Sequence, residues 1–219
     1  FLEEMETVPL ENPWAAKKLE ENDTIIFGYP VQFSNIPYFV RIFIEENGEI
    51  WKGKKVFCLV TMGAFSGDGA GCAARLLEKK GAVILGGVHV KMPDSVCDNP
   101  LLKKSFEENQ QLVEKATEKI EKVALDIKRQ VYPKEGLSFL THVIGLFGQR
   151  LWFYHKTRAY NKKLNIHENC NGCGICAQNC PTQNLSLLDG KAVAGNQCTM
   201  CYRCISKCPQ KAITLLGKT

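Results

Sequence analysis

Two copies of one cysteine pattern, C-x-x-C-x-x-C-x-x-x-C-P, dominate the C-terminal part of this chain. They contain eight of its eleven cysteines: Cys170, Cys173, Cys176 and Cys180, followed by Cys198, Cys201, Cys204 and Cys208. This spacing is the ligand run for 4Fe-4S clusters, in which three closely spaced thiolates bind one cluster and the fourth, before the proline, binds the other. We therefore predict cluster I on Cys170, Cys173, Cys176 and Cys208, and cluster II on Cys198, Cys201, Cys204 and Cys180.

Two other uses of closely spaced cysteines fit this pattern less well. Zinc sites also use C-x-x-C pairs, but a tetrahedral site is built from two pairs and gives the third cysteine of each run no role. A disulfide framework is typical of small secreted domains, whereas the rest of this chain reads as an intracellular domain with isolated cysteines. Iron-sulfur ligation is the interpretation that uses all eight thiols.

The two cysteine runs form an internal repeat of 28 residues. The first loop contains Gly172 and Gly174, while the second has Met200 and Tyr202 and is conformationally less permissive. On these motifs, residues 164–216 resemble the bacterial two-cluster ferredoxins. The resemblance implies a small pseudo-twofold module of short strands and single-turn helices around the metal. Such a module buries little apolar surface, so we expect the clusters to supply much of its stability.

The N-terminal part of the chain alternates between apolar runs and amphipathic segments. We expect helices over 11–22, with Asn12 as N-cap, over 36–46, from the loop 62–71 to Lys80, and over 99–130. Strands are expected over 24–29, 56–61 and 82–88. Continuous apolar runs suit parallel strands that are buried on both faces. This alternation predicts an α/β fold with a doubly wound parallel sheet.

In such a sheet, ligands bind outside the carboxyl ends of the strands, where two of the predicted loops would meet. A family resemblance is carried by three segments, Gly28-Tyr29-Pro30-Val31-Gln32-Phe33, Thr61-Met62-Gly63 and Ser66-Gly67-Asp68. On these segments, residues 1–131 resemble a flavodoxin. The resemblance implies that the two loops enclose the isoalloxazine ring of FMN. The cofactor-binding residues that it implies are Pro30, Val31, Gln32, Phe33, Ser34, Asn35, Thr61, Met62, Gly63, Phe65, Gly67 and Asp68.

Three of these loop residues also have plain structural interpretations. Phe33 and Phe65 are candidates to stack on a flavin ring, and either could equally fill the space between loop and helix. Asp68 could be the N-cap of the helix that follows it.

Along its whole length the chain resembles the flavodoxin-ferredoxin fusion proteins of anaerobes. The expected parts are a flavodoxin-like domain over 1–131, a helical linker over 132–163 and a ferredoxin domain over 164–219.

The chain departs from that family at its start. Flavodoxins open with a hydrophobic strand and a loop whose backbone N–H groups hold the FMN phosphate, and neither precedes Phe1. The strand over 24–29 would then lack a neighbour and present an aggregation-prone edge. We expect that residue 1 is not the natural start. The alternative is a degenerate domain that has lost FMN and covers its edge by dimerising, so FMN binding by this chain and its oligomeric state stay open.

The expected linker combines an apolar band with a basic end. Leu137, Leu140, Ile144, Phe147 and Leu151 recur at helical spacing, and His155, Lys156, Arg158, Lys162 and Lys163 follow them. A helix packed between the two domains fits this pattern, with His142 as a structural residue. The alternative is an amphipathic helix at an anionic membrane surface, although Gly145, Gly148 and Arg150 interrupt the apolar band.

Charge and hydropathy narrow the classes of partner. The formal net charge is +5, but two oxidised clusters with their thiolates bring it to about +1, which argues against a nucleic-acid-binding protein. No apolar run is long enough to span a bilayer, and no secretory signal is visible. We therefore predict no stable membrane insertion and a reducing, cytoplasmic location.

These features predict an electron-transfer protein. Clusters move one electron at a time and flavins one or two, so electrons would pass between the two 4Fe-4S clusters and FMN or an external redox partner protein. The alternative is a pure ferredoxin-type carrier whose flavodoxin-like part binds no flavin and serves for docking. The sequence contains no acid, base or nucleophile constellation, so catalysis by a side chain is not predicted, while a flavin and iron-sulfur oxidoreductase stays open.

Overall fold

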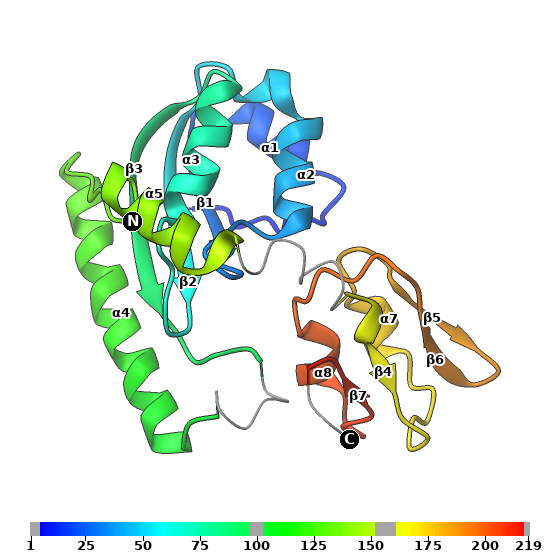
Figure 1. Ribbon diagram of the computed structural model, residues 1–219. Helices are drawn as coiled ribbons and strands as arrows, with labels where there is room; N and C mark the ends of the chain where they lie inside the picture. The colour runs from blue at the N-terminus through cyan, green and yellow to red at the C-terminus, as the bar shows by residue number, and fades with distance from the viewer. Residues whose placement is uncertain (1–4, 97–102, 152–160, 217–219) are drawn as a thin grey trace. The chain divides into compact units, whose positions relative to one another are not determined.

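A computed structural model describes residues 5–96, 103–151 and 161–216 (Figure 1). The chain divides into two compact units. Unit 1 comprises Phe1–Pro93 and Ser105–Leu151, and unit 2 comprises Asp94–Lys104 and Trp152–Thr219. Within the described residues, no helix combines the length and the apolar character that crossing a membrane requires.

Unit 1 is built on a parallel sheet. Its strands are β1 (Thr24–Pro30), β2 (Lys55–Met62) and β3 (Val83–Lys91), in the order β1-β2-β3. Thr24 lies opposite Lys55, and Lys55 lies opposite Val83. This arrangement confirms the predicted parallel α/β sheet. Among the described residues β1 pairs only with β2, so it forms one edge of the sheet.

Helices cover both faces of this sheet (Figure 1). They are α1 (Ala15–Glu21), α2 (Tyr38–Glu46), α3 (Gly69–Lys79) and α4 (Phe106–Lys128), with a 3-10 turn, η1, at Gly48–Trp51. Side chains alternate along a strand, so Val56 packs with α2 and α3 while its neighbour Phe57 packs with α4. The result is a three-layer unit with a core on each side of the sheet. A flavodoxin-like topology stays a prediction.

Helix α2 begins two residues later than the sequence predicted, at Tyr38, and two other helices of unit 1 begin at least four residues later. The helix expected over 11–22 starts at Ala15, because Asn12 lies in a turn in which its side chain accepts a hydrogen bond from the Trp14 amide at 2.9 Å. The helix expected from residue 99 starts at Phe106. There Ser105 and Glu108 form a reciprocal capping box, which satisfies two free amides at the helix start. Residues 99–102 lie outside the described residues.

The segment after α4 is extended before it becomes helical. Lys134 forms a parallel bridge with Gly87, whose amide donates to the Pro133 carbonyl at 2.8 Å. Helix α5 (Phe139–Gly145) follows, with Ser138 as its cap, and continues directly into a π-helical turn, η3 (Leu146–Arg150). Residues 132–138 therefore add a short strand-like edge to β3 rather than the start of a helical linker.

Replacing Gly86 by Ala is expected to displace this added edge. A Cβ at Gly86 would collide with the Pro133 carbonyl oxygen, which is backbone and has little room to move. We expect the free energy of unfolding to fall by about 1–3 kcal/mol, measured by urea denaturation. Gly28→Ala is the matched control, because its nearest atom would be the Leu59 carbonyl oxygen at 3.8 Å. Equal losses in both variants would contradict the argument.

Unit 2 consists of short strands and helical turns. They are η4 (Asn161–Lys163), β4 (Asn165–Ile166), α7 (Ile175–Gln178), β5 (Leu185–Leu188), β6 (Lys191–Ala194), α8 (Arg203–Lys207) and β7 (Ile213–Thr214). Strand β4 pairs with β7, and β5 pairs with β6, both antiparallel. The small apolar core is formed by Leu185, Ala192, Ile213 and the side chain of Cys176. These elements agree with the module expected from the cysteine pattern.

The two cysteine runs share a backbone conformation as well as a sequence pattern. Gly172 and Gly174 have φ of 69° and 77°, and the equivalent Met200 and Tyr202 have φ of 56° and 59°. Further along the repeat, Gln183 and Lys211 have φ of 51° and 50°. The left-handed region costs a residue with a Cβ about 1 kcal/mol. The second loop is thus less permissive in sequence, as predicted, yet it adopts the same conformation.

Candidate functional site

Unit 2 contains two cavities, each lined by four cysteines. Cavity I is lined by Cys170, Cys173, Cys176 and Cys208. Cavity II is lined by Cys180, Cys198, Cys201 and Cys204. In each case three thiols come from one copy of the pattern and the fourth from the other. The structure thus brings together the two quartets that the sequence named.

Backbone amides point at several of these sulfurs in a repeated pattern. The amide of Asn184 donates to the sulfur of Cys180 at 3.1 Å, and the amide of Ala212 donates to that of Cys208 at 3.3 Å. The amide of Ala192 lies 3.5 Å from the sulfur of Cys170. Such donors stabilise negative charge on sulfur, and hydrogen bonds of this kind tune the potential of iron-sulfur clusters.

Burial makes two thiols of cavity II, Cys198 and Cys204, hard to ionise without a cation. Desolvation, together with the neighbouring thiols, raises the pKa of Cys204 to about 12. Desolvation also raises the pKa of Cys176 in cavity I. In contrast, the amides of Ala192 and Gly172 lower the pKa of Cys170. A bound metal deprotonates its thiol ligands outright, so this donor set fits a metal cluster.

The geometry fits a cluster better than a single ion. Among the described residues, no group of three or more His, Cys, Asp or Glu side chains is placed to hold one metal ion. A 4Fe-4S cluster spreads its four thiolate ligands over different irons. Four cysteines around a shared cavity are therefore the arrangement that a cluster requires.

The two loops predicted to enclose flavin meet at the carboxyl ends of β1 and β2. The amide of Val31 donates to the carbonyl of Thr61 at 2.8 Å. Phe33 and Ser34 form a tight turn with φ of 49° and 57°. Backbone hydrogen bonds between the flanking residues Gln32 and Asn35 close this turn. A Cβ on Gly67 would lie 3.0 Å from the Ser34 hydroxyl, so the loops touch there.

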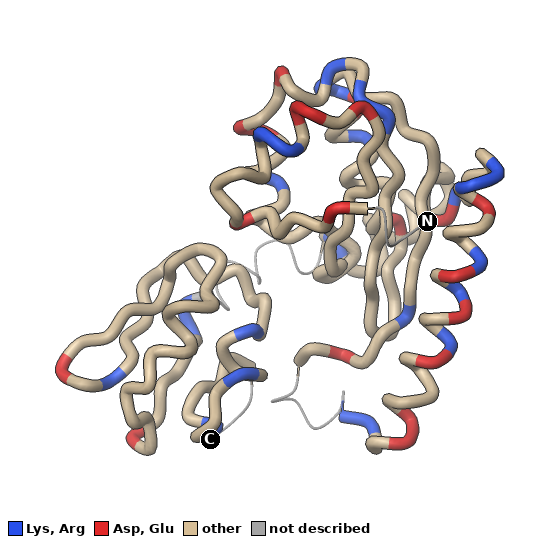
Figure 2. The backbone as a smooth tube through the Cα atoms, turned by 180° about the vertical axis from the view of Figure 1, so that it is seen from behind, with Lys and Arg blue, Asp and Glu red and all other residues tan. Residues whose placement is uncertain are grey.

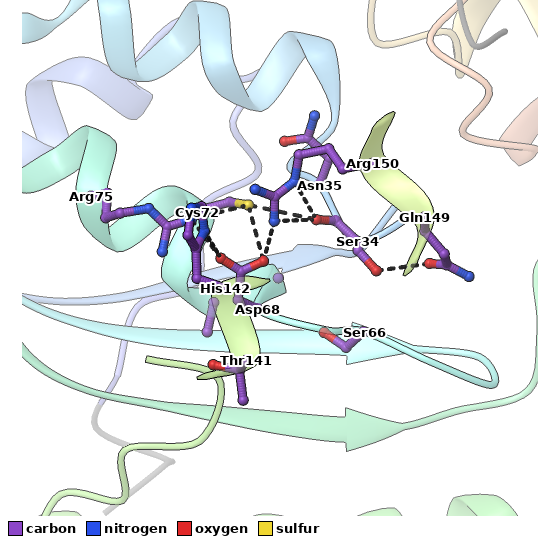
Figure 3. Close-up of polar contacts among 12 residues, drawn as sticks. Ser34, Asn35, Ser66, Asp68, Cys72, Arg75, Thr141, His142, Gln149 and Arg150 are labelled. Atoms are coloured by element: carbon purple, nitrogen blue, oxygen red, sulfur yellow. Dashed lines mark hydrogen bonds and ion pairs between the residues drawn. The ribbon is translucent and has the colours of Figure 1, made fainter. Parts of the chain in front are cut away.

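Asp68 is the centre of the polar contacts in this region (Figure 3). Its carboxylate is fully buried and pairs with Arg75 at 2.5 Å, with His142 at 2.8 Å and with Arg150. Arg150 also donates to the Ser34 carbonyl at 3.1 Å. Asp68 occupies the N-cap position of α3, but its side chain makes no capping bond. Asp68 is thus the N-cap residue, as one interpretation of the sequence had it, but its carboxylate forms ion pairs and does not cap the helix.

Sequence reasoning missed the contribution of α5 and η3 to this cluster. His142 and Arg150 come from these elements, and Gln149 accepts a hydrogen bond from the Ser34 hydroxyl at 2.8 Å. Gly145 has a packing role as well as interrupting the apolar band. Its Cα lies so close to Gly67 that a Cβ on Gly67 would be 2.7 Å from it. The available signal was the spacing of His142, Gly145 and Gln149, which places them on one helical face.

The apolar band of the same segment lies on its other side. Leu140, Phe147 and Leu151 keep 67%, 63% and 55% of their surface exposed. The segment is thus held to unit 1 by polar side chains, glycines and Leu137, which packs against the core, while the other apolar side chains of the expected packing helix stay exposed. Within the basic run, His155, Lys156 and Arg158 lie outside the described residues, and Lys162 and Lys163 are exposed.

The remaining residues predicted for flavin binding follow the same two loops. Phe65 is 43% exposed, and Phe33 is partly buried. Pro30 ends β1, while Thr61 and Met62 end β2 and precede Gly63.

Two thiols outside the quartets are unreactive at neutral pH, because burial raises the pKa of Cys58 to about 12 and that of Cys72 to about 11.

Comparison with known proteins identifies the first cysteine run of unit 2. Residues 166–186 match the family of 4Fe-4S binding domains, a span that contains the whole first cysteine run. A search of curated proteins found no match to the chain. The C-terminal region of this chain therefore contains a 4Fe-4S binding domain of the ferredoxin type.

Proposed function

We propose that this protein carries electrons through two 4Fe-4S clusters, cluster I in cavity I and cluster II in cavity II, and exchanges them with an external redox partner. The observation that carries the proposal is the composition of the two cavities, each lined by three thiols of one repeat and one thiol of the other. The clusters, when bound, supply one-electron chemistry. The match to a 4Fe-4S binding domain supports the first repeat directly.

The chain's own residues would hold the clusters and set their properties. The amides of Asn184 and Ala212 donate to sulfurs of opposite cavities and would stabilise their negative charge. Leu185 and Tyr202 are buried beside cavity II and limit the access of water. Because each cavity borrows one thiol from the other repeat, the two clusters would lie close together, which favours electron exchange between them.

Flavin binding is the weaker part of the expected function. The polar groups that were expected to face FMN are buried and bonded within unit 1. Ser34 bonds to Gln149, and Asp68 bonds to Arg75, His142 and Arg150. The two loops are also in contact with other parts of unit 1, because α5 packs against Gly67 through Gly145 and η3 bonds to Ser34. This favours the alternative in which the chain is an electron carrier without flavin.

Counting iron, sulfide and flavin in the same anaerobically purified sample tests both parts of the proposal. We expect about eight irons and about eight sulfides per chain, as two 4Fe-4S clusters require, and no flavin absorption after addition of FMN and gel filtration. About four irons would contradict the second cluster. One bound FMN per chain would favour the alternative, in which electrons pass between the clusters and flavin.

A further inference from the structure

Charged side chains are distributed unevenly between the two cavities of unit 2. Between residues 161 and 216 the acidic residues are Glu168 and Asp189. Glu168 lies two residues before Cys170 of cavity I, and Asp189 precedes Gly190, which touches Gly172 of the same cavity. Figure 2 shows acidic residues of this unit at the β5–β6 hairpin and at the turn after β4. Lys191, Lys207 and Lys211 are the chain neighbours of Ala192, Cys208 and Gln210, which line cavity I, so this cavity has both acidic and basic residues next to its lining.

Within two positions along the chain of the residues that line cavity II, the charged residues are all cations. Lys162 and Lys163 directly precede Leu164, which lines the cavity and packs with Cys204 and Ile205. Arg203 lies between the lining residues Tyr202 and Cys204. No Asp or Glu lines this cavity among the described residues. We call the four cations Lys162, Lys163, Arg203 and Lys207 the basic face.

Helix α8 fixes two of these cations beside the thiol that crosses into cavity II. Lys207 donates to the side-chain oxygen of Asn179 at 2.6 Å, and Arg203 approaches the Asn179 carbonyl at 3.4 Å. Asn179 immediately precedes Cys180. Lys207 remains exposed despite this bond. Its charge is therefore both close to cluster II and accessible to a partner.

We propose that the basic face is the docking surface for an acidic redox partner, a protein that presents Asp and Glu around its own redox centre, and that electrons enter and leave through cluster II. The inference rests on the two-cluster function proposed above. Opposite charges steer diffusional encounter and fix orientation more than they add affinity. The residues next to the lining of cavity II carry only positive charge, whereas Glu168 lies beside that of cavity I, and this is the feature that an acidic partner requires.

The same cations bias where the electron resides. Reduction adds one negative charge to a cluster, and nearby positive charge favours the more negative state. Because the lining of cavity II has cations and no acidic residue beside it in the sequence, cluster II would be the better acceptor of the two. The electron would reside on the cluster at which the partner docks.

Oxidation of the reduced holoprotein by small oxidants of opposite charge tests the basic face. We expect the rate with the anion Fe(EDTA)⁻ to fall when salt rises from about 20 to about 200 mM, and the rate with hexaamminecobalt(III) to rise. The double variant Arg203→Glu with Lys207→Glu should slow the anionic oxidant about tenfold at low salt. The matched control, Lys191→Glu with Lys211→Glu, makes the same charge change beside cavity I and should have a much smaller effect.

A macromolecular test then identifies the class of partner. Reduction of an acidic flavodoxin by the holoprotein should show the same salt dependence and the same response to the two double variants. Iron must be counted in every variant. If the wild type holds only one cluster, the proposed function fails, whereas two clusters with equal effects from both double variants overturn only the docking inference. Tighter binding to phosphatidylserine vesicles or to single-stranded DNA than to the flavodoxin would overturn the assignment to an acidic protein.

Discussion

Replacing Cys180 by Ser is expected to abolish cluster II and leave cluster I in place, although Cys180 belongs to the first cysteine run. Its sulfur lines cavity II with Cys198, Cys201 and Cys204. Hydroxyl oxygen is a poor ligand for iron in these clusters, which are held by thiolates. The iron content should fall from about eight to about four per chain, and the EPR spectrum of the reduced protein should lose the magnetic interaction between two clusters.

Cys208→Ser provides the mirror test, because its sulfur lines cavity I although it ends the second run. Cys72→Ala is the control, since this thiol lies outside both cavities and should leave the iron content unchanged. Loss of cluster I in the Cys180 variant would refute the exchanged arrangement. Complete loss of iron with unfolding of unit 2, seen by proteolysis, would instead show that neither cluster is stable alone.

Replacing Asp68 by Ala is expected to destabilise unit 1 by about 3 kcal/mol. Removing one partner of a buried ion pair leaves charge uncompensated, and such changes cost about 3–5 kcal/mol. The lower end applies here because the side chains of Arg75 and His142 are 38% and 31% exposed and can reach water. Without the carboxylate, three cationic or basic groups would face one another at the junction of α3, α5 and η3 (Figure 3).

Urea denaturation measures this loss, and limited trypsin digestion shows where it acts. The side chain of Arg150 is 13% exposed in the wild type, so release of η3 should speed cleavage after Arg150. Glu21→Gln is the control, because its ion pairs with Lys17 and Lys18 are exposed and worth less than about 1 kcal/mol. An Asp68 variant with unchanged stability and unchanged cleavage would show that Asp68 does not hold α5 and η3 in place.

The parts of the fold that could be predicted are those with short-range patterns. The apolar run of β1 and the cysteine spacings act over a few residues, so their sequences predicted a strand and two four-thiol sets. The cluster around Asp68 could not be predicted, because it joins a loop to His142 and Arg150, which lie 74 and 82 residues further along the chain. Nothing local to Arg150 distinguishes an arginine that pairs with a distant carboxylate from one that faces solvent.

Backbone conformation in the second cysteine loop was also beyond sequence reasoning. Met200 and Tyr202 have no intrinsic preference for the left-handed region, yet they adopt it at the positions of Gly172 and Gly174. Both side chains are buried, so packing offsets the local cost. The repeat of conformation follows from the need to place equivalent sulfurs, which glycine content alone does not reveal.

The exchange of one thiol between the repeats has a consequence for biosynthesis. A nascent polypeptide that ends between the two repeats would offer three ligands for cluster I, because Cys208 has not yet been translated. Cluster I could then be completed only after Cys208 has been translated. In the proposed carrier, neither half of the repeat could thus be metallated fully before the other has been made.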